Sequence, residues 1–66
     1  MLDILLSLME KKKITGYQLA LLSGQQHGTI YRILNGKNPL GFKLFEKLVN
    51  SMGFDVDIQT KERFND

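Results

Sequence analysis

Few side chains in this 66-residue chain have the types and spacing that catalysis or metal binding requires. The chain has no cysteine, and its single histidine, His27, cannot assemble a zinc-type set of ligands. Asp55 and Asp57 would share one side of a strand, but most residues two positions apart do the same. The sequence holds no second histidine, no phosphate-binding loop and no spaced pair of carboxylates on one element. It therefore predicts no enzymatic activity, no cofactor and no metal site.

Basic side chains are concentrated in the middle of the chain. From Lys11 to Lys47, seven lysine and arginine residues stand against one acid, Glu46, which gives +7 − 1 = +6. From Phe54 onward, two basic residues stand against four acids, which gives +2 − 4 = −2. A basic body with an acidic tail suits a surface that meets a polyanion, with a separate segment kept away from it. A solvated surface that only maintains solubility explains the charge equally well.

The length allows one small domain. A chain of this size buries only about 60 % of its unfolded surface, so its stability is marginal without a disulfide, a metal or a partner subunit. Because disulfides are excluded, an efficient helical core, oligomerisation or both remain. The apolar run from Ile4 to Met9 is too short to span a membrane, and no signal-peptide cleavage site follows it. We therefore expect a cytoplasmic protein.

Hydrophobic periodicity predicts four helices. Their expected bounds are about Leu2 to Lys12, Thr15 as N-cap through Leu22, about Gln26 to Leu34, and Gly41 to Met52. Turn chemistry separates them, because glycine or Asn-Gly follows the second, third and fourth helices. The side chains expected to face inward from these three helices are Leu19, Leu22, Ile30, Ile33, Phe42, Phe45, Leu48, Val49 and Met52.

The period changes after the fourth helix. Apolar and polar residues alternate strictly from Phe54 to Gln59, which is typical of a strand. A single strand leaves its backbone hydrogen-bonding groups unpaired and needs a partner from another chain. We therefore expect an all-α domain over residues 1–53, a dimerisation strand over residues 54–60 and a polar tail over residues 61–66. The side chains buried between the two strands of a homodimer would be Phe54, Val56 and Ile58.

The spacing of small and apolar residues within residues 14–36 (ITGYQLALLSGQQHGTIYRILNG) has a physical reason. Two helices that meet at a steep angle across a short turn need a small side chain at their closest approach. They also need a left-handed residue at the bend and an apolar anchor on the inner face of the second helix. Ala20, Gly24 and Ile30 meet these three needs in that order.

With that spacing, the segment resembles the helix-turn-helix of the lambda-repressor-like (Cro/repressor, Xre-type) DNA-binding family. The family motif ends in an arginine or similar residue, Ile or Leu, any residue, Asn-Gly-Lys and then a proline. The stretch from Arg32 to Lys37, followed by Pro39, matches this ending. The resemblance covers about Leu5 to Val56. It implies a four- to five-helix domain that binds double-stranded DNA with its third helix in the major groove.

The resemblance also implies roles for individual residues. The residues expected to meet base edges are His27, Gly28 and Arg32. Arg32 is the first candidate, because a guanidinium can bond O6 and N7 of guanine together. The residues expected to contact phosphates are Tyr17, Gln26, Thr29, Tyr31, Asn35 and Lys37, with Lys43 more distant. Interpreted without the motif, His27 is an ordinary exposed helix residue and Tyr31 packs against the loop that follows.

Two positions depart from the family pattern. Gly16 stands where the family often has a glutamine that braces a backbone contact, so Tyr17 or Gln18 would have to replace that contact. Gly28 is unusual inside a reading helix, where glycine costs about 1 kcal/mol relative to alanine. It either permits close approach to a base or a phosphate, or has no role.

The implied function is transcriptional regulation, as a phage-type repressor or as the antitoxin of a toxin–antitoxin operon. A twofold dimer would place two third helices about 34 Å apart and would require a palindromic operator. In antitoxins of this family the C-terminal segment often also binds the toxin, which makes a toxin a second candidate partner. The rival prediction, favoured by Gly16 and Gly28, is a protein–protein interaction module that kept the fold and lost DNA binding.

Overall fold

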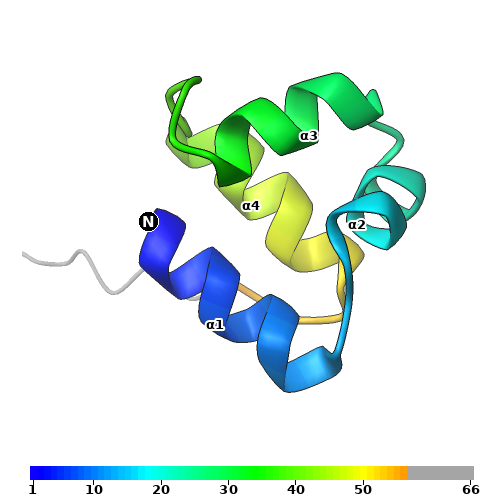
Figure 1. Ribbon diagram of the computed structural model, residues 1–66. Coiled ribbons are helices and arrows are strands. Elements are labelled where there is room, and N and C mark those ends of the chain that lie inside the picture. Colours follow the sequence, from blue (N-terminus) through cyan, green and yellow to red (C-terminus); the bar gives the residue numbers. More distant parts are fainter. Residues whose placement is uncertain (57–66) are drawn as a thin grey trace, which may run out of the picture.

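The computed structural model describes residues 1–56 of the chain. This part contains four helices and no strand (Figure 1). The helices are α1 (Leu2–Lys12), α2 (Gly16–Ser23), α3 (His27–Leu34) and α4 (Phe42–Ser51). The prediction of a small all-helical domain with four helices is confirmed, and the predicted ends differ from the observed ones by one residue at most.

Helix α4 lies in the middle of the domain. In the view of Figure 1 it crosses the centre, with α3 above it, α1 below it and α2 at one side. Packing joins α2 to α3 and α4, and joins α1 to α4 and α3. Helix α3 therefore packs on α2 and α1.

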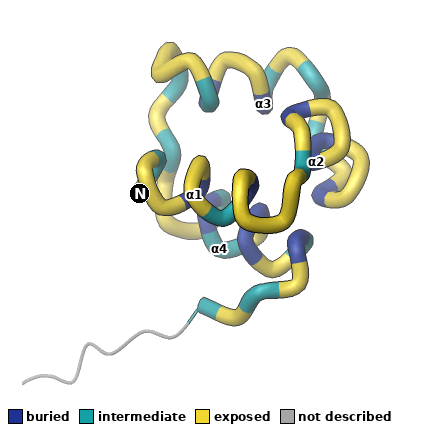
Figure 2. The backbone as a smooth tube through the Cα atoms, turned by 60° about the horizontal axis from the view of Figure 1, so that its bottom comes forward, coloured by how far each residue is buried: buried dark blue, intermediate teal, exposed yellow. Residues whose placement is uncertain are grey.

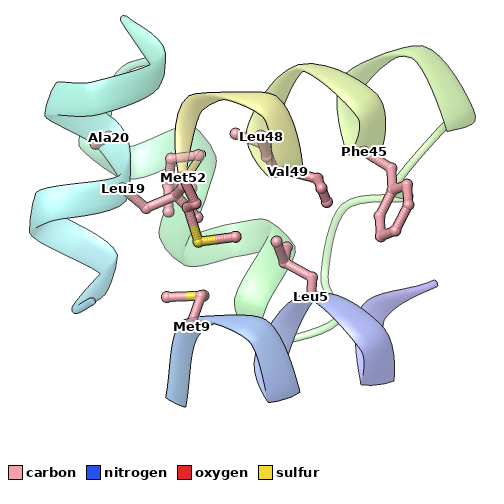
Figure 3. Close-up of a cluster of buried hydrophobic side chains, with 9 residues drawn as sticks. Leu5, Met9, Leu19, Ala20, Phe45, Leu48, Val49 and Met52 are labelled. Atoms are coloured by element: carbon pink, nitrogen blue, oxygen red, sulfur yellow. The ribbon is translucent and has the colours of Figure 1, made fainter. Parts of the chain in front are cut away.

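One apolar cluster holds the four helices together. Figure 3 shows Leu5 of α1 and Leu19 of α2 directed toward Leu48 of α4, and all three side chains are fully buried. Figure 2 shows the buried residues of each helix on the side that faces its neighbours. Burying one such leucine contributes about 1.5–3 kcal/mol relative to leaving it exposed. Since helices of eight to eleven residues are marginal alone, this packing is what stabilises them.

Both ends of α2 are fixed by local chemistry. The Thr15 hydroxyl accepts a hydrogen bond from the Gln18 backbone N–H at 3.1 Å, and the Gln18 side-chain Oε1 accepts one from the Thr15 N–H at 2.9 Å. These two bonds form a capping box. At the other end Gly24 has φ +75°, and its N–H donates to the Ala20 carbonyl. The predicted N-cap and glycine stop are confirmed.

Two predictions of inward-facing side chains are wrong. Leu22 is 54 % exposed and Phe42 is 43 % exposed. In α2 the core side is formed by Leu19 with the small residues Ala20 and Ser23, which let the neighbouring helices come close, so Leu22 is turned outward. Phe42 lies in the first turn of α4, and its ring is tilted by 34° relative to that of the buried Phe45, with 6.4 Å between centroids.

The segment after α4 packs on its own chain. The Phe54 N–H donates to the Val49 carbonyl at 3.2 Å, and the Lys12 ammonium lies 5.2 Å from the centroid of the Phe54 ring. Phe54 and Val56 are both partly buried against the core. Residues 54–56 form no strand, and the rest of the predicted strand, including Ile58, lies outside the described residues. The dimerisation strand stays a prediction.

Among the helices within residues 1–56, none is long and apolar enough to cross a membrane.

Candidate nucleic-acid interface

Helices α2 and α3 are joined by a three-residue turn, residues 24–26. Gly24 provides the left-handed bend, and the Gln25 N–H donates to the Ala20 carbonyl at 3.1 Å. Gln26 then caps α3 with an extended backbone and remains exposed. Across this turn Ala20 and Ile30 are almost completely buried, as their spacing predicted. The turn and this contact fix the direction of α3 relative to α2.

The two sides of α3 differ sharply in exposure. Ile30 and Ile33 are buried on the inner side. Gly28, Arg32 and Asn35 are exposed on the outer side, and Gly28 and Arg32 are aligned because four positions separate them. The outer side of α3 is therefore free to enter a groove.

The Arg32 side chain lies back over the first turn of α3. A Cβ atom placed on Gly28 would be 3.3 Å from the Arg32 Nη1 and 4.0 Å from its Cζ. Side chains on a helix point toward its N-terminus, so this direction is the ordinary one for a long residue. The structure thus brings together two of the residues predicted to meet base edges, and it places the charge near the N-terminal turn of α3.

His27 lies on a different flank of α3 from Arg32. Its ring stacks on that of Tyr17, with 4.5 Å between centroids and 28° between planes. His27 is half-buried, and its Nε2 is buried without a hydrogen-bond partner among the described residues. The reason is helical spacing, since His27 aligns with Tyr31, which faces α2. In this position the Nε2 edge of His27 is not presented to a ligand, and the more exposed ring is that of Tyr17.

Gly16 forms a close contact between α2 and α3. It is buried, and a Cβ placed on it would lie 3.0 Å from Cε1 of Tyr31 and 3.1 Å from Cδ1 of Leu34. The Tyr31 ring therefore sits on the backbone of the first turn of α2 while remaining 46 % exposed. The departure from the family pattern at this position has a packing reason, which the sequence alone did not reveal.

The Gln18 side chain takes part in the cap of α2. Its Oε1 accepts the Thr15 N–H, so of the two side chains considered as replacements at this end of α2, Tyr17 is the one outside the capping box. Of the two residues that form the capping box, only Thr15 was predicted. The spacing Thr-x-x-Gln is the signature that would have predicted the role of Gln18 as well.

The chain leaving α3 is tied to the last turn of the helix. The backbone N–H groups of Lys37 and Asn38 donate to the Arg32 carbonyl at 2.8 and 3.2 Å, and that of Asn35 donates to the Tyr31 carbonyl at 2.9 Å. Asn35 and Lys37 are exposed, whereas Thr29, at the other end of α3, is half-buried. Four of the predicted phosphate-contacting residues thus lie at the ends of α3, namely Gln26 and Thr29 at the start and Asn35 and Lys37 after the last turn, whereas Tyr17 lies on α2 and Tyr31 within α3.

The sequence on both sides of α3 carries charge of one sign. No aspartate or glutamate occurs between Lys11 and Phe45. The exposed basic residues of this stretch are Lys11, Lys12, Lys13, Arg32, Lys37 and Lys43. A stretch of this composition attracts a polyanion.

Residues 1–56 contain no detectable pocket and no group of three or more His, Cys, Asp or Glu side chains that could hold a metal ion. A scan against protein-family models and searches of curated proteins and of solved structures found no match to this chain.

Proposed function

We propose that this protein binds double-stranded DNA sequence-specifically by placing the outer side of α3 in the major groove. The observation that carries the proposal is the Arg32 guanidinium, which lies exposed over the first turn of a helix fixed by α2. An α-helix fits the major groove, and the N-terminal residues of a reading helix meet the base edges. No acidic side chain in the surrounding sequence opposes the phosphates.

In this proposal the residues around α3 divide into two roles. Arg32 reads a guanine through O6 and N7, which discriminates among base pairs. Tyr17, Tyr31, Asn35 and Lys37 contact phosphates, which position the helix but carry no sequence information. As a regulator, the protein would occupy a palindromic operator as a homodimer and repress transcription.

The first experiment is selection of bound sequences from a library of randomised duplex DNA, followed by titration at several salt concentrations. Binding should select a defined motif. The logarithm of the binding constant should fall linearly with the logarithm of salt concentration, with a slope of about −0.9 for each phosphate engaged. Binding that selects no motif and does not respond to salt would contradict the proposal.

Two substitutions separate the proposed roles. Arg32→Ala should cost about 1–3 kcal/mol on the selected site and relax the preference at one base pair, because a base contact is lost. Lys37→Ala should weaken binding to all sequences by a similar factor and reduce the salt slope by about one. Fluorescence anisotropy on matched and mismatched duplexes measures both effects. Uniform weakening by Arg32→Ala would show that Arg32 is not a base reader.

A second candidate function is protein–protein interaction, and a specific observation favours it. Leu21 and Leu22 on α2 are 60 % and 54 % exposed, and α2 carries no charged residue. Exposed apolar side chains on an uncharged helix are a feature of interaction surfaces. The most specific form of this alternative is an antitoxin-like protein that binds a toxin. Two results together would favour it: the purified chain selects no DNA motif, and Leu21→Ser abolishes its binding to a partner protein.

A further inference from the structure

We infer that Gly28 is a positioning residue for Arg32: the absence of a side chain at Gly28 allows the Arg32 guanidinium to lie across the first turn of α3. The placement of the guanidinium is a property of the free protein. Its consequence for base recognition rests on the proposed function.

The contact that supports this inference is specific to the pair. An added Cβ at Gly28 would meet the Arg32 Nη1 at 3.3 Å, which is closer than most real Cβ contacts, so the guanidinium would have to move by a few tenths of an ångström. Apart from the two chain neighbours of Gly28 and the backbone of its own helix, Arg32 is the one residue among those described with atoms within 4 Å of that Cβ position. Beyond its own stretch of helix, a methyl group at Gly28 would therefore disturb Arg32.

Backbone conformation does not explain the glycine. The glycines with a left-handed φ are Gly24, Gly36 and Gly53, and Gly28 is not among them. Gly28 is helical and exposed, which is an environment where alanine is favoured over glycine. The one effect of the missing side chain that the structure shows is the space occupied by Arg32.

Orientation is what a bidentate contact depends on. A guanidinium discriminates guanine from other bases on the order of ten- to a hundredfold when both of its hydrogen bonds are well placed. A displaced guanidinium keeps its charge, and so keeps its attraction to DNA, but loses alignment with O6 and N7. We therefore expect a substitution at Gly28 to affect base preference more than affinity.

The test is the Gly28→Ala variant, compared with wild type in thermal unfolding and in binding to matched and mismatched duplexes. The midpoint of unfolding should rise by about 2–6 °C, because alanine replaces glycine in a helix. Discrimination at the base pair read by Arg32 should nevertheless fall by about threefold or more. A gain in stability combined with a loss of discrimination cannot result from misfolding.

Two further variants complete the experiment. Gly41→Ala is the matched control, because nothing lies within 4 Å of its Cβ position and it lies outside α3; its discrimination should equal that of wild type. In an Arg32→Ala background, Gly28→Ala should have no additional effect on discrimination. Two results would overturn the inference. One is an effect of Gly28→Ala on discrimination that persists in the Arg32→Ala background. The other is wild-type discrimination in Gly28→Ala when Arg32→Ala has lost it.

A measurement without DNA tests the placement separately. In the free protein, nuclear Overhauser contacts are expected between the Arg32 side chain and the Gly28 α-protons, and Gly28→Ala should shift the Arg32 Nε resonance. Absence of both signals overturns the inference even if the protein binds DNA. If the contacts are present but wild type selects no DNA motif, the proposed function fails while the positioning of Arg32 stands.

Discussion

At the scale of single residues, Gly16 and Gly28 both have a neighbouring side chain in the space beside them. Gly16 lies under the Tyr31 ring and Leu34, and Gly28 lies under the Arg32 guanidinium. They differ in what an added methyl group would meet. At Gly16 it meets side chains packed between two helices, whereas at Gly28 it meets the free end of an exposed side chain. Substitution by alanine should therefore lower the stability of the domain at Gly16 and raise it at Gly28.

We expect Gly16→Ala to destabilise the domain by about 1–3 kcal/mol, because overpacking forces α2 and α3 apart. Chemical denaturation monitored by circular dichroism measures the change. Removing the Tyr31 ring should relieve part of the clash, so Gly16→Ala in a Tyr31→Ala background should cost less than it does in wild type. Equal costs in the two backgrounds would show that Tyr31 does not lie against Gly16.

At the scale of elements, the short helices depend on their caps and on contacts with one another. α2 has eight residues, too few for a stable isolated helix, and its first turn is held by the reciprocal bonds between Thr15 and Gln18. α3 has no side-chain cap and is held instead by packing on α2 and α1 and by the chain that follows it. The orientation of the proposed reading helix is therefore set largely by α2.

Substitutions in the cap of α2 test how much these hydrogen bonds contribute to the stability of the domain. Thr15→Ala should lower the free energy of unfolding by about 1 kcal/mol, because the Gln18 N–H in the first turn of α2 loses its hydrogen-bond acceptor. Gln18→Ala combined with Thr15→Ala should cost less than the sum of the two single changes, since both belong to one capping box. Ser7→Ala on the exposed side of α1 serves as the control and should change stability by less than about 0.5 kcal/mol. Additive costs for the two cap variants would contradict the reciprocal arrangement.

At the scale of the whole molecule, the predicted homodimer relies on side chains that also serve the fold of the single chain. Phe54 and Val56, two of the three side chains predicted to form the dimer ribbon, are partly buried in the core of their own chain. A substitution at Val56 would consequently disturb the fold as well as any dimer. Ile58, which lies outside the described residues, is the position at which the dimer prediction is best tested.

We expect wild type to sediment as a dimer at tens of micromolar, and Ile58→Asp to sediment as a monomer with unchanged helical content. The reason is that a charge on the buried side of a strand ribbon has no partner there. Gln59→Asp introduces the same charge on the opposite side of the predicted strand and should leave the dimer intact. Wild type that sediments as a monomer, or equal effects of the two substitutions, would show that the strand does not mediate association.

Features fixed by neighbours in the chain were predictable from the sequence. The four helices, the Thr15 cap and the glycine stop at Gly24 depend on hydrophobic spacing and local hydrogen bonds, and the structure confirms them. The buried pair Ile30 and Ile33 follows from the same spacing. Leu22 was assigned to the wrong side of its helix, because periodicity gives an apolar arc but not the part of it that neighbouring helices cover.

In the candidate site, too, some features follow from the sequence and others from the packing of the helices. The residues of α3, and the spacing that aligns Gly28 with Arg32, can be read from the chain alone. Three other features depend on how the helices pack: His27 faces Tyr17 on α2, Tyr31 sits on Gly16, and Arg32 is exposed over Gly28. The physical reason is that these outcomes depend on the distance and angle between helices, which are set by the packing of the whole core and not by residues adjacent in the chain.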